Sequence, residues 1–301
     1  MTTSVHPLDP SPAHGGPRQL WSLTTSGCPR GLALAREPGW LLVWDEHSWL
    51  YLLNRTGQRQ GQTRARGTLA AVCGADDGSA YAAVGSTGEV WWLAPDLMPR
   101  WERTLPHRAV AAALDSFGQY LAVADANGQL HLFSRAGRPV CQVQALRPLV
   151  HLAFVTEAPL LVGSADFGLV ACFDLTGRCV WRDGLVANIG ALTVSGDGAR
   201  IMLACFSEGL LCYSLAGRRQ DRLPLSEPCG LAALSYDGRF TLAGTLDSRL
   251  LLLDREGQNL TSYPLDHPAA ALALAPLADS AFAALPDGHV VALDLRDVLR
   301  R

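Results

Sequence analysis

The chain has 301 residues, of which 49% are hydrophobic and 18% charged, and its formal net charge is −3. This composition excludes a disordered chain, and the small negative charge argues against nucleic acid or anionic lipid as a partner. Every basic side chain other than histidine is an arginine, which excludes mechanisms that use lysine as a Schiff base or general base.

The beginning of the chain, residues 1–19, is rich in proline and glycine and contains no apolar run. This pattern predicts a flexible leader and does not fit a signal peptide. No later stretch approaches the roughly 18 uncharged apolar residues that a membrane span needs. We therefore expect a cytoplasmic protein without a membrane-spanning segment.

A repeated unit occupies the rest of the chain. Each copy reads as a short Ala/Leu-rich strand, a polar turn, a second apolar strand, a tight turn, a third alternating strand and a turn that ends in glycine. The first strands of the copies centre near Leu32, Leu69, Ala112, Leu152, Leu192, Ala232 and Leu272. These positions are separated by 37 and 43 residues and then by steps of 40.

A period near 40 residues with four short strands per unit is typical of a β-propeller blade. Helical repeats would show apolar residues at helical spacing, whereas these segments are interrupted every few residues by Gly, Asp or Asn. We predict an all-β fold in which residues 20–301 form one domain. That domain is a monomeric seven-bladed β-propeller with four antiparallel strands per blade around a central channel.

The two ends of the repeat array complement each other. The last unit ends at residues 289–301 with a third strand and lacks a fourth. Residues 19–24 form an apolar strand that precedes the first unit. We expect this N-terminal strand to complete the C-terminal blade, because that pairing covers two exposed sheet edges at once.

Two segments resemble known propeller families. Residues 231–254, LAALSYDGRFTLAGTLDSRLLLLD, resemble a WD-repeat blade without its Trp-Asp dipeptide. Residues 174–181, DLTGRCVW, resemble the unit of quinoprotein-like repeats, and Trp101 is a partial second match. The first resemblance implies a scaffold for protein partners, and the second implies a group that includes dehydrogenases but also many members without a quinone.

Arginines recur just before the first strands of four blades. The predicted partner-binding arginines are Arg30, Arg66, Arg108 and Arg147. The corresponding places in the last three blades hold Asn188, Glu227 and His267, so only one arc of this propeller face is basic. Because guanidinium groups form paired hydrogen bonds to carboxylates, this arc predicts a site for an acidic peptide or another anion. The alternative is ordinary solvated charge on loops.

A second candidate patch lies beside this arc, at the turn formed by residues 45–48. Trp44 and Trp49 flank the turn, and His47 lies within it. Aromatic side chains at a loop rim are frequent anchors of protein interfaces, although burial between blades is the simpler explanation for tryptophans in a propeller.

Opposite charges also recur on the other face of the propeller. Arginines such as Arg55 and Arg255 follow the third strands, and acidic residues such as Glu37 and Asp279 follow the first strands. We expect these charges to form local ion pairs of structural significance only.

Catalytic and metal-binding patterns are weak in this sequence. The eight cysteines contain no CxxC pair, the histidines form no ligand triad, and no Ser/His/Asp or Cys/His arrangement stands out. We therefore predict no catalytic residue, no metal ligand and no cofactor. The expected function is a non-catalytic scaffold that binds a protein or an acidic peptide. The alternatives are a quinoprotein- or lactonase-type enzyme or cofactor binder, and a sensor of a small ligand or anion at the channel mouth.

Overall fold

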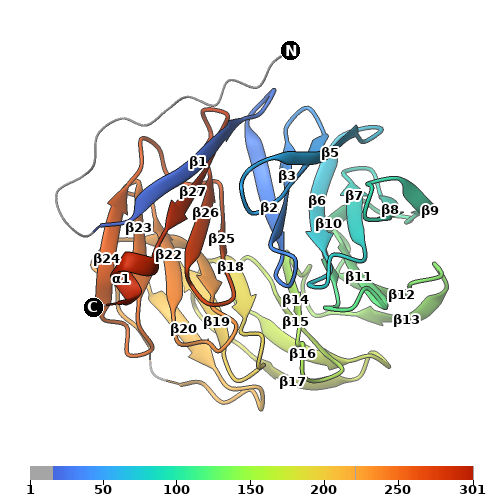
Figure 1. The fold of residues 1–301 in the computed structure, drawn as a ribbon. Helices are drawn as coiled ribbons and strands as arrows, with labels where there is room; N and C mark the ends of the chain where they lie inside the picture. Colours follow the sequence, from blue (N-terminus) through green and yellow to red (C-terminus); the bar gives the residue numbers. More distant parts are fainter. Residues whose placement is uncertain (1–15, 221, 301) are drawn as a thin grey trace.

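The computed structural model of the protein describes residues 16–220 and 222–300, which form seven antiparallel sheets arranged in a ring (Figure 1). This arrangement confirms the predicted seven-bladed β-propeller. The leader expected at residues 1–19 lies largely outside the described residues, although Arg18 and Gln19 already belong to the first strand.

Strands follow one another within each blade from the channel outward. The first three blades contain β2 (Pro29–Ala35), β3 (Trp40–Asp45), β4 (Trp49–Leu53) and β5 (Arg59–Arg64); β6 (Leu69–Gly74), β7 (Tyr81–Gly85), β8 (Glu89–Leu93) and β9 (Pro99–Thr104); and β10 (Ala109–Leu114), β11 (Tyr120–Asp125), β12 (Gln129–Ser134) and β13 (Pro139–Gln144). The next two contain β14 (His151–Phe154), β15 (Leu160–Ser164), β16 (Val170–Asp174) and β17 (Cys179–Asp183); and β18 (Ile189–Val194), β19 (Ile201–Cys205) and β20 (Gly209–Tyr213). The last two contain β21 (Cys229–Leu234), β22 (Thr241–Thr245), β23 (Arg249–Leu253) and β24 (Asn259–Pro264); and β25 (Ala271–Leu274), β26 (Ser280–Ala284), β27 (His289–Asp294) and β1 (Arg18–Thr24).

The fifth blade differs from the other six at its outer edge. Its sheet contains three strands. In place of the fourth strand that the other blades have, Arg219 and Leu223 form isolated bridges to Tyr213 and Leu210, respectively. The outer strand of this blade is therefore reduced to two points of pairing among the described residues.

The repeat is more regular than the sequence analysis predicted. Leu32 pairs with Val43 in the first blade, and Val72 pairs with Ala83 in the second. Val72 rather than Leu69 therefore corresponds to Leu32, and the expected steps of 37 and 43 residues are wrong. Equivalent positions recur every 40 residues through all seven blades, because the third-blade pair Ala112–Val123 continues the same spacing.

Closure of the ring occurs as expected. β1 pairs antiparallel with β27, with Leu23 opposite Val290 and Thr24 opposite His289, and the two strands lie side by side in Figure 1. The short helix α1 (Arg296–Leu299) follows β27. No helix among residues 16–220 and 222–300 has the length and apolar character needed to cross a membrane.

The hydrophobic core lies between the blades. Each of seven buried clusters combines side chains from two adjacent blades; one of them joins Leu23, Ala273 and Phe282 of the last blade to Leu41 and Val43 of the first. Apolar side chains on both faces of a sheet thus leave water, which explains why the second and third strands read as nearly continuous apolar runs.

The loops divide between two faces, because successive strands within a blade are antiparallel. We call the side formed by the blade-to-blade connections and the second-to-third-strand turns the junction face. We call the opposite side, formed by the first-to-second-strand and third-to-fourth-strand turns, the turn face. On the junction face, backbone bonds tie the two kinds of loop together, as in the bond from Ala65 N to Ser48 O (2.9 Å).

Candidate functional site

All four predicted partner-binding arginines lie at the junction face and are exposed. Arg30 is the second residue of β2 and forms an ion pair with Glu46 at 3.3 Å. The side chains of Arg66, Arg108 and Arg147 lie in the next three blade-to-blade connections and form no ion pair or hydrogen bond with any described residue. These three guanidinium groups are available to an external anion.

The expectation that these arginines occupy equivalent positions is wrong. In the 40-residue register Arg66 corresponds to Ser26, Arg147 to Gly27 and Arg108 to Cys28. Each of these three arginines therefore occupies a different position within its blade-to-blade connection, and the arc is less regular than expected.

The turn at residues 45–48 is rigid. The Asp45 carboxylate is buried and accepts hydrogen bonds from the backbone N–H groups of His47 and Trp49, both at 3.0 Å. Its other oxygen accepts bonds from the hydroxyl groups of Ser26 (2.8 Å) and Tyr51 (2.9 Å). This network fixes the exposed His47 at the face.

The two flanking tryptophans do not form one patch. The Trp44 indole packs over the backbone of Gly31 on the first strand, where an added Cβ would lie 2.3 Å from Nε1. Trp49 instead packs beside Arg64, whose guanidinium carbon lies 5.9 Å from the ring centroid. Both are half-buried, and they contact different strands of the blade, Trp44 the first and Trp49 the fourth.

An apolar arc on the junction face was not found from the sequence. Its exposed side chains are Leu146, Phe167, Val186, Phe206 and Leu246, from the fourth to the sixth blades. Val186 is 91% exposed. Backbone contacts link the arc: Phe167 pairs with Asn188, Phe206 N donates to Asn188 O at 3.2 Å, and Leu246 N donates to Pro228 O at 2.9 Å.

The turn face holds a ring of equivalent positions around the channel mouth. Each lies one or two residues after the end of a first strand, and successive members are separated by 40 residues. They are Arg36, Asp76, Ser116, Thr156, Gly196, Tyr236 and Pro276. This ring was not predicted from the sequence, because an alignment displaced by three residues in the second blade does not bring Asp76 into line with Arg36.

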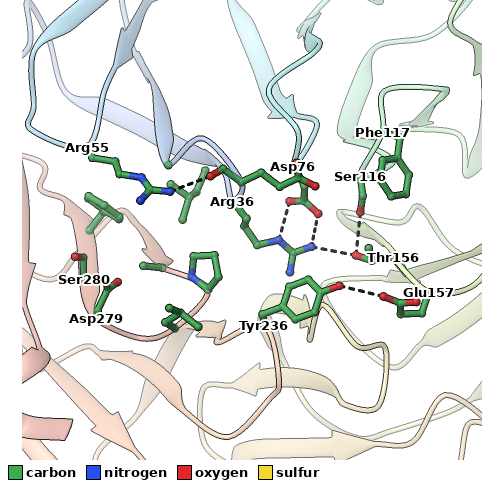
Figure 2. Close-up of a pocket in the computed structure, with 17 residues that line it drawn as sticks. Arg36, Arg55, Asp76, Ser116, Phe117, Thr156, Glu157, Tyr236, Asp279 and Ser280 are labelled. Carbon is green, nitrogen blue, oxygen red and sulfur yellow. Dashed lines mark hydrogen bonds and ion pairs between the residues drawn. The ribbon is translucent and has the colours of Figure 1, made fainter. Parts of the chain in front are cut away.

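Polar side chains of this ring bond to one another across the mouth (Figure 2). Arg36 Nε and Nη2 donate to the two carboxylate oxygens of Asp76 at 2.7 and 2.5 Å. Arg36 Nη2 also donates to Thr156 Oγ1 at 3.2 Å, and Ser116 Oγ donates to the same oxygen at 2.9 Å. The first four blades are thus joined by one network.

Tyr236 enters the mouth from the sixth blade. Its hydroxyl donates to Glu157 Oε1 at 3.0 Å, and this bond raises the pKa of Tyr236. The Arg36 guanidinium carbon lies 5.5 Å from the centroid of its ring. The ring lies over Gly196, where an added Cβ would approach Cδ2 within 2.1 Å, so this contact requires glycine.

Two cavities meet at the network. A channel of about 330 Å³ is lined mainly by the first strands, and a second cavity of about 540 Å³ opens at the turn face. Arg36, Asp76 and Ser116 line both. The ion pair therefore lies between the channel and its outer mouth.

No ion pair among the described residues joins a third-to-fourth-strand arginine to an acid of a first-to-second-strand turn, although Arg178 pairs with Asp174 of its own turn at 3.1 Å. Arg55 donates to the backbone carbonyl groups of Glu37 (2.9 Å) and Pro38 (3.0 Å) instead of to a carboxylate. Four of the acidic residues, Asp77, Asp115, Asp197 and Asp237, cap their own turns, as Asp115 does with the N–H groups of Gln119 and Tyr120, both at 2.6 Å. The recurrent acid is explained by turn formation.

Other reactive side chains are held in structural environments. Burial lowers the pKa of His151, whose Nε2 lies 3.4 Å from Ile189 O. The eight cysteines are not in disulfides. Across the part of the chain that the structure describes, no group of three or more His, Cys, Asp or Glu side chains could hold a metal ion.

Comparison of the chain with models of protein families and with curated proteins finds no match. The seven-bladed propeller is therefore established by the strand topology itself.

Proposed function

We propose that the protein is a non-catalytic, cytoplasmic interaction scaffold, which acts as a monomer. Its junction face binds a partner protein through a segment that combines acidic and apolar side chains. Arg66, Arg108 and Arg147 contact the acidic groups, Arg30 and His47 border the site, and Trp44 and Trp49 support this edge.

The observation that carries this proposal is that the basic arc and the apolar arc adjoin at the fourth blade. The guanidinium carbon of Arg147 lies 3.9 Å from the position that a Cβ added to Gly168 would take, and Gly168 follows Phe167. Leu146 precedes Arg147 in the same connection. A ligand that crosses this boundary meets unpaired arginines on one side and exposed apolar side chains on the other. Charge-assisted hydrogen bonds and apolar burial would therefore act on the same segment.

Rigidity of the face supports binding. The connections are bonded to the neighbouring turns, as in the bond from Ala126 N to Arg108 O (3.0 Å). A surface that is already ordered loses little conformational entropy when a partner binds.

The repeat type is also a proposal. We place the blades in the WD-repeat-like or quinoprotein-like group, on the resemblance of their turns. Trp21, Trp101 and Trp181 support the second of these: each indole N–H donates to a backbone carbonyl in the next blade, that of Arg55, Arg135 and Leu215, respectively.

Binding of a labelled peptide tests the function. The probe is a fluorescein-labelled peptide in which Glu alternates with Leu and Phe, compared with a version that carries arginine in place of Glu. We expect the acidic peptide to bind and the basic one to fail. Combined replacement R66E/R108E/R147E should weaken binding at least about tenfold, through loss of attraction and added repulsion.

The matched control is the triple variant R100E/R135E/R218E, which makes the same charge change at exposed positions. Arg135 and Arg218 lie in third-to-fourth-strand turns, and Arg100 lies at the start of β9, directly after such a turn. Its binding should stay close to that of the unchanged protein. Equal loss in both variants would show that net charge, and not the junction face, governs the interaction.

The enzyme alternative has a separate test. Calorimetric titration with calcium and with pyrroloquinoline quinone should give no saturable heat if the protein is a scaffold. Saturable binding of either would favour the cofactor-binding alternative.

A further inference from the structure

The turn-face cavity lies chiefly at the seam between the last and first blades. Leu34, Glu37 and Gly39 contribute from the first blade, and Pro276, Asp279 and Phe282 from the last. Figure 2 shows Asp279 and Ser280 on the side of the cavity away from Ser116 and Phe117. The seam is where the chain closes on itself, so this cavity is unlike the mouth of a fully symmetric ring.

Among the described residues, backbone bonding between neighbouring first-to-second-strand turns is missing at this seam, as it is at the two junctions that the fourth blade makes. At four other junctions a backbone N–H of one first-to-second-strand turn donates to the next blade's turn, as from Glu37 to Asp76 O (2.9 Å) and from Tyr236 to Pro276 O (2.8 Å). Among the described residues, the turns at 275–279 and 35–39 share no such bond. The first turn is instead held toward the second blade, where Pro38 packs on Gly78.

Charge in the cavity is unbalanced. Its lining contains the carboxylates of Glu37, Asp76, Glu157 and Asp279 but only two guanidinium groups, those of Arg36 and Arg55. Asp76 holds Arg36, and Arg55 is directed to backbone carbonyl groups. The carboxylates of Glu37 and Asp279 accept no hydrogen bond from any described residue, and Arg296, which interacts electrostatically with Asp279, is hydrogen-bonded to Asp294. The charged side chains that remain available for hydrogen bonds on the seam side of the cavity are therefore carboxylates.

Apolar side chains form the rest of the wall. Phe117 is 53% exposed and Leu277 is 77% exposed, and both lie at the cavity with Leu34, Pro276 and Phe282. Such exposure at a concave site, next to unbalanced charge, is unusual for solvated turns and typical of ligand sites.

We propose that this cavity binds a small organic cation, an ammonium or guanidinium group on an apolar or aromatic body. The cationic group bonds to Glu37 and Asp279, and the body packs against Leu277 and Pro276 on the same side of the cavity. A cavity of about 540 Å³ is within the size range of small-molecule sites. An anionic ligand is disfavoured, because it would face the unpaired carboxylates while Arg36 is already held by Asp76.

Three probes with the same phenyl body test the charge preference: 2-phenylethylamine, 2-phenylethanol and 3-phenylpropionate. Isothermal titration calorimetry on the full chain should show saturable binding of the amine, at least about tenfold weaker binding of the alcohol, and none of the carboxylate. Binding of the carboxylate as strong as that of the amine, or absence of saturable amine binding in the millimolar range, overturns the proposal.

Variants locate the site. E37Q and D279N should each weaken amine binding several-fold, and the double variant at least about tenfold. The control E256Q removes an exposed carboxylate from the same face but outside the cavity and should bind normally. An equal effect of E256Q would contradict the proposed location.

A variant that fills the cavity tests the location of the site without changing its charge. Ser280→Trp places at the seam the residue that the first blade carries at its equivalent position, Trp40, and should abolish binding of the amine while the melting temperature shows that the ring remains folded. Retained binding in a folded Ser280→Trp protein overturns the seam site. This site does not depend on the junction face, so R66E/R108E/R147E should bind the amine normally.

Discussion

At the scale of single residues, a tryptophan side chain joins neighbouring blades at three of the junctions. Trp181 donates from its indole nitrogen to Leu215 O at 2.8 Å, and its rings stack on Tyr213 with a centroid separation of 6.1 Å. Trp101 makes the corresponding bond to Arg135 O at 2.9 Å. Each indole covers the turn glycine of the following blade, Gly217 and Gly137, respectively.

Replacement W181F should lower the free energy of unfolding by about 1 kcal/mol, because it removes this hydrogen bond and keeps an aromatic ring. Urea denaturation measures the change. W49F is the matched control, since the Trp49 indole N–H forms no hydrogen bond to a described residue. A loss in W49F as large as that in W181F would show that the hydrogen bond is not the cause.

The pKa of Asp294 is held below its usual value by hydrogen bonds from Arg296, whose Nε and Nη2 lie 2.9 and 2.6 Å from its two oxygens. A depressed pKa in the folded state means that the pair stabilises the protein above the unfolded-state pKa of about 3.9. This stabilisation is lost as the pH falls through the lower, folded-state pKa.

D294N should therefore reduce stability near neutral pH and flatten the acid side of the stability profile. The measurement is the urea midpoint as a function of pH for both proteins. Parallel profiles below about pH 4 would argue against a contribution from Asp294.

At the scale of secondary-structure elements, β1 is the strand that closes the ring. It covers the edge of β27, and its Leu23 is buried with Phe282 and Val43 at the seam. The strand lies in the last blade although it is the first in the chain, so the ends of the chain hold the ring together.

Two deletions test this role. Removal of residues 1–17 leaves β1 whole and should change the melting temperature very little. Removal of residues 1–25 deletes β1, exposes β27 and should destabilise the protein severely. Thermal unfolding followed by circular dichroism compares the two; equal tolerance would contradict closure by β1.

At the scale of the whole molecule, each blade is buried by both neighbours. Every core cluster spans two adjacent blades, as in the cluster that joins Leu203 and Tyr213 of the fifth blade to Val162 of the fourth. Because the ring is closed, it has no terminal repeat with an uncovered face, unlike an open repeat array. We expect the blades to unfold together.

Two signals test this cooperativity. Tryptophan fluorescence reports on the first, second, fourth and last blades, which contain all eight tryptophans, whereas far-UV circular dichroism reports on every strand. The two urea transitions should coincide. Separate midpoints would show that part of the ring opens first.

Most of the fold was predictable from local patterns. Short apolar segments and Gly-containing turns repeat along the chain, and such signals act within a few residues. Closure was predictable because one unpaired strand lies at each end of the array. The register of the second blade was not, since Leu69 and Val72 both fit an apolar strand and only pairing with Ala83 distinguishes them.

The candidate sites were predictable only in part. The exposed arginines of the junction face were recognisable as charges in or next to the connections between blades. That Arg30 forms an ion pair with Glu46 while the other three form none among the described residues depends on where neighbouring acids lie in space. The apolar arc was hidden because Val186 and Leu146 look like ordinary strand-flanking residues in the sequence.

The sequence by itself determined the period, the number of blades and the closing strand, because strand and turn preferences are set by neighbouring residues. Tertiary structure alone decided that Arg36 contacts Thr156, 120 residues away, and that Tyr236 contacts Glu157, 79 residues away. It also decided that the seam between the last and first blades opens into a cavity. These contacts depend on how far each side chain reaches across a closed ring, and that distance is fixed only when all seven blades pack together.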